Sequence, residues 1–164
     1  MKQELELSLD PVDIKLLEAL QDDASQSNQD LARSVHISAP TCLRRVKRLH
    51  DAGLVERQVA LLGTDRLASV LGYGLTAIVE ITLDKQGAEL QEAFERRVVL
   101  DAAVQQCYRV SPGPDFVLMV HVPDMPRYLA LAQRLFTDDA NVRNVKAFFS
   151  TKRAKFEPKV LLTQ

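Results

Sequence analysis

The chain has 164 residues, of which 46% are hydrophobic and 26% are charged, and its net charge is −1. This composition is typical of a folded soluble protein and excludes a disordered or fibrous chain, and no apolar run approaches the ~18 residues that a membrane-spanning helix needs. Cys42 and Cys107 form no CxxC pair, which favours a reducing compartment. Because the N-terminus also lacks a signal-peptide pattern, we expect a cytoplasmic protein.

Charge is unevenly distributed over the first third of the chain. Residues 1–30 carry eight acidic side chains against two basic ones, whereas residues 31–57 carry six basic against two acidic ones. A basic segment on a nearly neutral protein suits a DNA-binding protein that must not bind every polyanion tightly.

Three helices are predicted in this part of the chain, each beginning at a capping residue. Asp10 followed by Pro11 starts the first helix, since aspartate caps well and proline fits the first helical position. Ser27 and Ser38 cap the second and third helices, and Gly53 ends the third.

The third predicted helix places basic side chains around an apolar stripe of Leu43, Val46 and Leu49. A tight turn separates it from the second helix, and the apolar, partly alternating segment 54–62 follows as a strand candidate. Together these elements predict a winged-type helix-turn-helix domain over residues 1–62, with the third helix in a DNA major groove.

Nine side chains are candidates for DNA contact. Arginine can bind guanine bidentately and lysine acts mainly as a point charge, while short polar groups at a helix start commonly bind phosphate. The alternatives are a solvated charged face, simple helix caps, and, for Arg45 beside the apolar stripe, a role in fixing the helix against its neighbours. The predicted DNA-binding residues are Ser27, Asn28, Gln29, Ser38, Thr41, Arg44, Arg45, Lys47 and Arg48.

A second domain is predicted over residues 73–164, after a linker of residues 63–72. Period-two alternation predicts a strand over 75–83, and further strand candidates are 104–110, 116–122 and 142–151. Helical patterns follow the first and the third of these strands. The order predicts a ferredoxin-like (ACT-like) βαββαβ sandwich and therefore an α+β protein. Because helices cover one face of such a sheet, we expect the other face to bind a second copy.

No catalytic constellation accompanies these elements. His36, His50 and His121 do not pair with another histidine, a cysteine or a carboxylate at metal-ligand spacing, and no nucleophile has a base beside it. We therefore expect no metal, no cofactor and no enzymatic activity.

Short motifs over residues 8–160 match one known family. They are Leu9-Asp10-x-x-Asp13-x-x-Leu16-Leu17, Asn28-x-x-Leu31-Ala32, Ser38-x-x-x-Cys42-Leu43-x-Arg45-Val46-x-x-Leu49, Gly53-Leu54-Val55, Ala60-Leu61-Leu62, Val79-Glu80-Ile81-Thr82-Leu83 and Val122-Pro123-Asp124-Met125. On these motifs the chain resembles the leucine-responsive regulator/AsnC (Lrp/AsnC, feast–famine) family of transcription factors. The resemblance implies an N-terminal DNA-binding domain and a C-terminal effector-binding domain. It also implies dimers that often assemble into octamers, with small molecules, usually amino acids, bound between dimers.

The resemblance also implies an effector pocket. In it, Asp115 would accept hydrogen bonds from the ammonium group of the ligand, and the phenylalanines would line an apolar slot. Alternatively, at least one phenylalanine lies in the core or in a dimer interface. The family turn Gly-Asp-(Tyr or Phe)-Asp is Pro112-Gly113-Pro114-Asp115 here, so only its last residue matches. Two prolines remove two backbone donors and stiffen the turn, which predicts an altered mode of binding, another effector or none. The residues at pocket positions are Ser111, Gly113, Asp115, Met125, Phe148, Phe149 and Ser150.

The sequence thus predicts a sequence-specific DNA-binding transcriptional regulator modulated by a small molecule such as an amino acid. Its expected partners are double-stranded DNA, the effector and a second copy in a homodimer, with no membrane; whether the assembly is a dimer or an octamer stays open. Two alternatives stay open: a nucleoid-type architectural DNA-binding protein of weak specificity, and a metabolite-binding module that acts on a protein partner.

Overall fold

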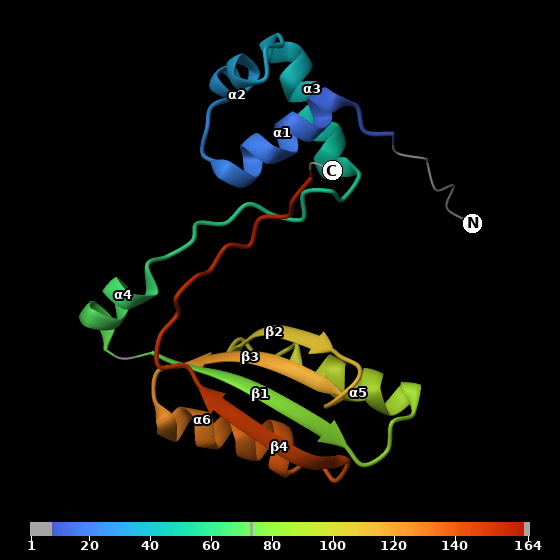
Figure 1. Ribbon diagram of the computed structural model, residues 1–164, viewed down its shortest axis with the longest axis vertical. Coiled ribbons are helices and arrows are strands. Elements are labelled where there is room, and N and C mark those ends of the chain that lie inside the picture. The colour runs from blue at the N-terminus through green and yellow to red at the C-terminus, as the bar shows by residue number, and fades with distance from the viewer. Residues whose placement is uncertain (1–7, 73, 163–164) are drawn as a thin grey trace. The chain divides into compact units, whose positions relative to one another are not determined.

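A computed structural model describes residues 8–72 and 74–162, which form two compact units (Figure 1). The first unit ends at Leu61 and also includes the C-terminal segment from Phe156, and the second runs from Leu62 to Lys155. None of the described helices is both long enough and apolar enough to cross a membrane.

The first unit contains α1 (Pro11–Asp22), α2 (Asn28–Ser34) and α3 (Ala39–Asp51). The predicted caps are confirmed, because the Asp10, Ser27 and Ser38 side chains each accept hydrogen bonds from backbone N–H groups of the first turn. The end of α3 is also as predicted. Gly53 has a φ of +73°, and its N–H and that of Leu54 donate to carbonyl oxygens of the last turn at 2.9 and 3.1 Å, a Schellman motif.

The core of this unit corrects the predicted apolar stripe of α3. Leu43 is 62% exposed, whereas Cys42 is fully buried. At 100° per residue Cys42 shares a face with Val46 and Leu49, and Leu43 points away from it. The buried hydrophobic residues are Leu16, Leu17, Leu31, Ala32, Val35, Cys42 and Leu49.

The segment after α3 also differs from the expectation. Residues 54 and 55 form a bend and residues 56–62 have no regular secondary structure, and residues 8–72 contain no strand that could pair with them. A strand exists only when a neighbouring strand accepts its backbone hydrogen bonds, so apolar alternation alone did not produce one.

The second unit begins with helix α4 (Thr64–Leu71), which lies within the stretch expected to be a linker. The remaining elements follow the predicted βαββαβ order: β1 (Leu75–Leu83), α5 (Ala88–Val98), β2 (Val104–Arg109), β3 (Phe116–Val122), α6 (Met125–Ala132) with a π-helical extension η1 (Gln133–Thr137), and β4 (Val142–Phe149). The four strands form an antiparallel sheet in the order β2-β3-β1-β4.

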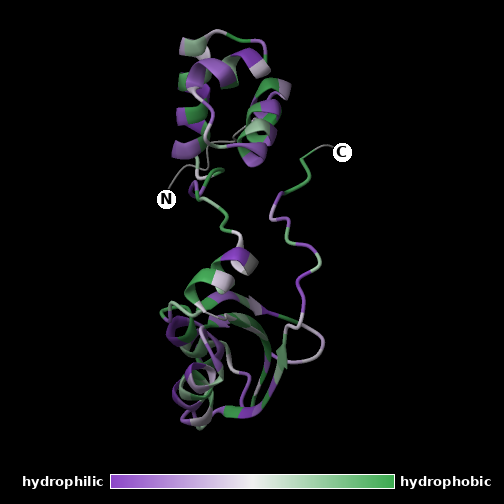
Figure 2. Cartoon of the chain, turned by 90° about the vertical axis from the view of Figure 1, so that its left-hand side faces the viewer, coloured by the Kyte–Doolittle hydropathy of each residue, from purple (hydrophilic) through white to green (hydrophobic). Residues whose placement is uncertain are grey.

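The core of the second unit lies between this sheet and the helices α5 and α6, which cover one of its faces (Figure 2). Alternate residues of β1, from Ala77 to Leu83, are buried against Phe94 of α5 and Leu131 of α6. The other face of the sheet carries the intervening side chains, among which Ile78 is exposed.

Candidate nucleic-acid interface and effector residues

The exposed face of α3 carries the basic side chains that the sequence singled out. Arg44 and Lys47 are exposed, and Arg48 is 45% exposed. The Lys47 Nζ atom pairs with Asp51 Oδ2 at 2.7 Å one turn along the helix. Such exposed pairs contribute little stability, so Lys47 remains available to another anion.

A buried carboxylate fixes this helix against the start of α1. The Asp13 side chain is 1% exposed; its Oδ1 accepts from Arg45 Nη1 at 2.8 Å and its Oδ2 accepts from Arg48 Nη2. The same Arg45 Nη1 donates to Asp10 Oδ2 at 2.6 Å. The four side chains Asp10, Asp13, Arg45 and Arg48 are called the α1–α3 ion cluster below.

The cluster shifts the pKa of its acidic members. Burial alone would raise the pKa of the Asp13 carboxyl, but hydrogen bonds from Arg45, the Asp10 backbone and Arg48 outweigh it and lower that pKa. Hydrogen bonds from the Asp13 backbone and then from Arg45 lower the pKa of Asp10. Both carboxylates are therefore charged at neutral pH and hold the arginines in place.

The start of α2 is tied to the start of α3. The Ser27 Oγ atom accepts from Asp30 N at 3.1 Å as a helix cap, and Asn28 Nδ2 donates to the carbonyl oxygen of Ala39 at 2.9 Å. The third predicted residue of this group, Gln29, is exposed. Capping thus occupies the Ser27 hydroxyl, while Asn28 sets the geometry of the turn between the helices.

Ser38 and Thr41 lie together at the first turn of α3. The Ser38 Oγ atom caps the helix at Thr41 N, at 3.4 Å, and donates to Thr41 Oγ1 at 2.8 Å. Leu43 was predicted to lie in the core, but it is exposed on this helix and is a further candidate for DNA contact. Its exposure on the basic helix was not recognisable without knowing which face of α3 packs inward.

The predicted effector residues fall into two groups at opposite ends of β1. Asp115 is buried; its Oδ2 accepts from Leu83 N at 2.7 Å and its N–H donates to Ile81 O at 2.8 Å. The exposed Ser111 and Gly113 belong to the same turn. This group therefore lies where β1 ends.

The second group lies where β1 begins. Phe149 pairs in register with Ala77, and its ring meets Tyr128 edge to face, with centroids 5.0 Å apart. Ser150 N donates to Thr76 O at 2.9 Å. The exposed Phe148 and Met125, the first residue of α6, complete this group. Along a strand, six residues span about 20 Å, so one chain does not bring the two groups together.

Comparison with known protein families identifies both units. A winged helix-turn-helix DNA-binding model matches residues 9–56, and the Lrp/AsnC ligand-binding domain matches residues 76–160. The chain belongs to the Lrp/AsnC family. It is a DNA-binding transcriptional regulator with a small-molecule-binding domain, not an enzyme, and this assignment disfavours the two alternative functions.

Relatives and solved structures match this regulator over nearly its whole length. The leucine-responsive regulatory protein of Rhizobium meliloti is 34% identical, with 91% of this chain and 93% of the relative covered. A crystal structure of an AsnC-family regulator from Agrobacterium tumefaciens has a TM-score of 0.82 at 29% identity, covering 94% of this chain and 97% of the other. A regulator from Neisseria meningitidis, solved as its L-methionine complex, also has a TM-score of 0.82, at 27% identity and the same coverage.

Proposed function

We propose that this regulator binds duplex DNA through the exposed face of α3, acts as a homodimer in the cytoplasm, and responds to an amino acid held between copies of its second domain. In this proposal residues 1–62 bind DNA, residues 63–72 link the domains, and the domain that begins at residue 73 binds the effector and oligomerises. The observation that carries the proposal is the exposed row of Arg44, Lys47 and Arg48 on a helix that a buried carboxylate fixes in place.

The side chains of α3 divide by their contacts. Arg44 and Lys47 are exposed and are assigned to phosphates or base edges, together with Arg48. Arg44, Arg45, Arg48 and Asp10 line a hollow of about 350 Å³, whose three guanidinium groups suit an anionic group of the DNA. Arg45 is a positioning residue, because its guanidinium is engaged with two carboxylates. The exposed Leu43 suits the methyl group of a thymine.

The polar residues around the two helix starts are the remaining candidates. Gln29 and Asn28, at the beginning of α2, and Thr41, in the first turn of α3, are assigned to phosphate contacts beside the backbone donors of the helix starts. Ser27 and Ser38 contribute mainly as caps of these helices.

Dimerisation is assigned to the face of the sheet that α5 and α6 leave open. Ile78 lies on this face, whereas its neighbour Ala77 is buried on the other face. Ile78 pairs in register with Met119 and Phe148. Ile78 and Phe148 are exposed large hydrophobic residues, as is Tyr108 on β2. A patch of this kind on a sheet typically marks a protein interface, and a second copy covers it by two-fold symmetry.

The separation of the two groups of predicted effector residues indicates that an amino-acid effector binds between chains. Asp115 and the Ser111–Gly113 turn lie at one end of β1, and Met125 with residues 148–150 lies at the other. A ligand that touches both groups must therefore lie between chains, and association of dimers into an octamer supplies such sites. The L-methionine bound by the Neisseria meningitidis relative supports an amino acid as ligand.

Selection from random duplexes tests the DNA-binding part of this proposal. We expect a roughly palindromic consensus with half-sites about 34–36 Å apart, bound by the wild type and by an Arg96→Ala control on α5. Arg44→Ala and Lys47→Ala should weaken binding. Failure to select any consensus would refute sequence-specific binding and favour an architectural protein. Equal binding by all four proteins would show that α3 does not contact DNA.

Thermal-shift measurements test the effector part. A ligand that binds only the native state raises the melting temperature by mass action. L-methionine and the other common amino acids are therefore screened against the wild type, with their oxo-acid relatives as controls. A flat response to every amino acid at millimolar concentration would refute amino-acid control.

A further inference from the structure

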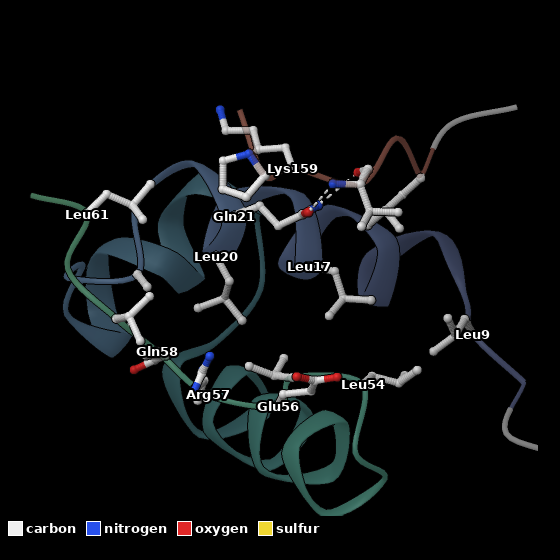
Figure 3. Close-up of a pocket in the computed structure, with 16 residues that line it drawn as sticks. Leu9, Leu17, Leu20, Gln21, Leu54, Glu56, Arg57, Gln58, Leu61 and Lys159 are labelled. Atoms are coloured by element: carbon white, nitrogen blue, oxygen red, sulfur yellow. Dashed lines mark hydrogen bonds between the residues drawn. The ribbon is translucent and has the colours of Figure 1, made fainter. Parts of the chain in front are cut away.

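An apolar groove runs along α1 in the first unit. It has a volume of about 450 Å³ and lies between α1 and the segment 54–61, with C-terminal residues along its edge (Figure 3). Its apolar lining includes Leu9, Leu17, Leu20, Leu54, Val55 and Val59. This groove holds none of the predicted DNA-binding or effector residues.

The C-terminal residues at the edge of the groove make specific contacts with the end of α1. Gln21 Nε2 donates to Val160 O at 3.1 Å, and Val160 N donates to Gln21 Oε1 at 2.6 Å. The Gln21 side chain thereby satisfies both backbone polar groups of one extended residue, as a neighbouring strand would do. One residue earlier, Lys159 Nζ pairs with Asp22.

These contacts place a positive charge at the C-terminal end of α1, where the helix itself has none. No basic residue lies in the last turn of α1, which ends at Asp22 and is followed by Asp23. Two acidic side chains at the negative end of a helix dipole are unfavourable, and Lys159 offsets this charge. Leu162 adds an apolar contact, because it packs against the core of the three helices. Charge, backbone hydrogen bonding and burial therefore all favour the same docked position.

We propose that residues 156–162, here called the strap, dock along the edge of this groove in the same chain as a fourth element of the DNA-binding unit. The strap makes a second covalent connection between the two units, since only residues 150–155 separate it from the end of β4. The first connection is the stretch around α4. A unit held through two connections has fewer accessible orientations than a unit held through one.

Hydrogen exchange on the full chain tests the docking without DNA or ligand. Leu162→Asp places a charge in the apolar contact, and its matched control is Leu161→Asp, since Leu161 is 92% exposed. We expect backbone amides of the last turn of α1 to exchange about tenfold faster in Leu162→Asp than in the control. Equal exchange in the two variants would overturn the proposal.

A milder variant keeps the test decisive if Leu162→Asp unfolds the unit. Gln21→Ala removes both hydrogen bonds to Val160 while favouring the helix, because alanine has the higher helix propensity. Faster exchange of α1 in this variant therefore reports the strap and not helix propensity. Unchanged exchange in Gln21→Ala would contradict the docking.

Cross-linking tests whether the strap docks within one chain. Gln21→Cys and Val160→Cys are combined in a background of Cys42→Ala and Cys107→Ser and treated with a short bis-maleimide. Docking within the chain produces a cross-linked monomer on a denaturing gel. A cross-linked dimer alone would show that the strap binds a second copy and would overturn the proposal as stated.

A DNA measurement tests the consequence of the second connection, which rests on the proposed function. The operator selected by the wild type is lengthened between its half-sites, and the loss of affinity is compared between proteins. We expect at least a threefold smaller loss for Leu162→Asp than for Leu161→Asp. Equal losses would refute the constraint on orientation. A wild type that selects no operator would refute the proposed function, and the exchange experiment would still decide the strap.

Discussion

The α1–α3 ion cluster should make the first domain sensitive to the charge of one buried side chain. Asp13→Asn keeps the size of the side chain and removes the charge that faces Arg45 and Arg48. Breaking a fully buried ion pair costs about 3–5 kcal/mol, whereas exposed pairs are worth about 0–1 kcal/mol. The Asp13 side chain is 1% exposed but its partners are 25% and 45% exposed. We therefore expect a loss of about 2 kcal/mol in the free energy of unfolding, between these limits.

The pH dependence of this loss follows from the lowered pKa of Asp13. An aspartate whose pKa is lower in the folded chain than its ordinary value of about 4 stabilises the fold fully above pH 4. That stabilisation disappears as the pH falls through the lowered pKa. The difference between wild type and Asp13→Asn should therefore be full at pH 7 and shrink below pH 4.

Urea unfolding followed by far-UV circular dichroism, at pH 7 and at pH 3, measures this difference. The matched control is Asp51→Asn on α3, because Asp51 pairs with Lys47 at the surface, where such a pair is worth only a few tenths of a kcal/mol. Equal stability of the Asp13 and Asp51 variants at pH 7 would refute the reasoning. So would a loss in Asp13→Asn that does not change between pH 7 and pH 3.

Three further substitutions test the remaining assignments. Arg48→Ala should weaken DNA binding. If Arg48 contacts a phosphate, the slope of log binding constant against log salt concentration should also fall in magnitude by about one. Fluorescence anisotropy at several salt concentrations measures both effects, and an unchanged affinity at low salt would contradict the assignment. Asp115→Ala should abolish most of the amino-acid binding measured by calorimetry. It should also lower the free energy of unfolding by about 1–3 kcal/mol, because it leaves the buried N–H of Leu83 unpaired. A ligand affinity equal to that of the wild type would exclude Asp115 from the effector site. Ile78→Glu should shift the protein from dimer to monomer in analytical ultracentrifugation, whereas Leu129→Glu, on the exposed side of α6, should not; a dimeric Ile78→Glu would move the interface elsewhere.

Local signals were sufficient for most secondary structure. Helix caps act within three or four residues, so Asp10, Ser27 and Ser38 marked the starts of α1, α2 and α3 correctly. The alternation of apolar and polar residues along β1 can likewise be recognised from the sequence of that strand alone. The strand β3 was predicted over the residues that form it, Phe116–Val122. The βαββαβ order follows from these elements and their spacing.

Which residues distant in the sequence contact one another depended on the tertiary structure. One member of the predicted apolar stripe of α3 was wrong, Leu43 in place of Cys42, because only packing against α1 and α2 shows which face is buried. Residues 54–62 formed no strand because the described part of the first unit offers no strand as a partner. The strap showed no periodicity, so nothing in its sequence indicated that it docks beside Gln21.

The candidate sites divide in the same way. The basic residues of α3 and the residues of the effector group were named from the sequence, since charge and motif are visible along the chain. The ion cluster around Asp13, and the placement of Asp115 and Phe149 at opposite ends of β1, arose only on folding. Burial, pairing and distance belong to residues far apart in the chain, and short-range propensity carries no information about them.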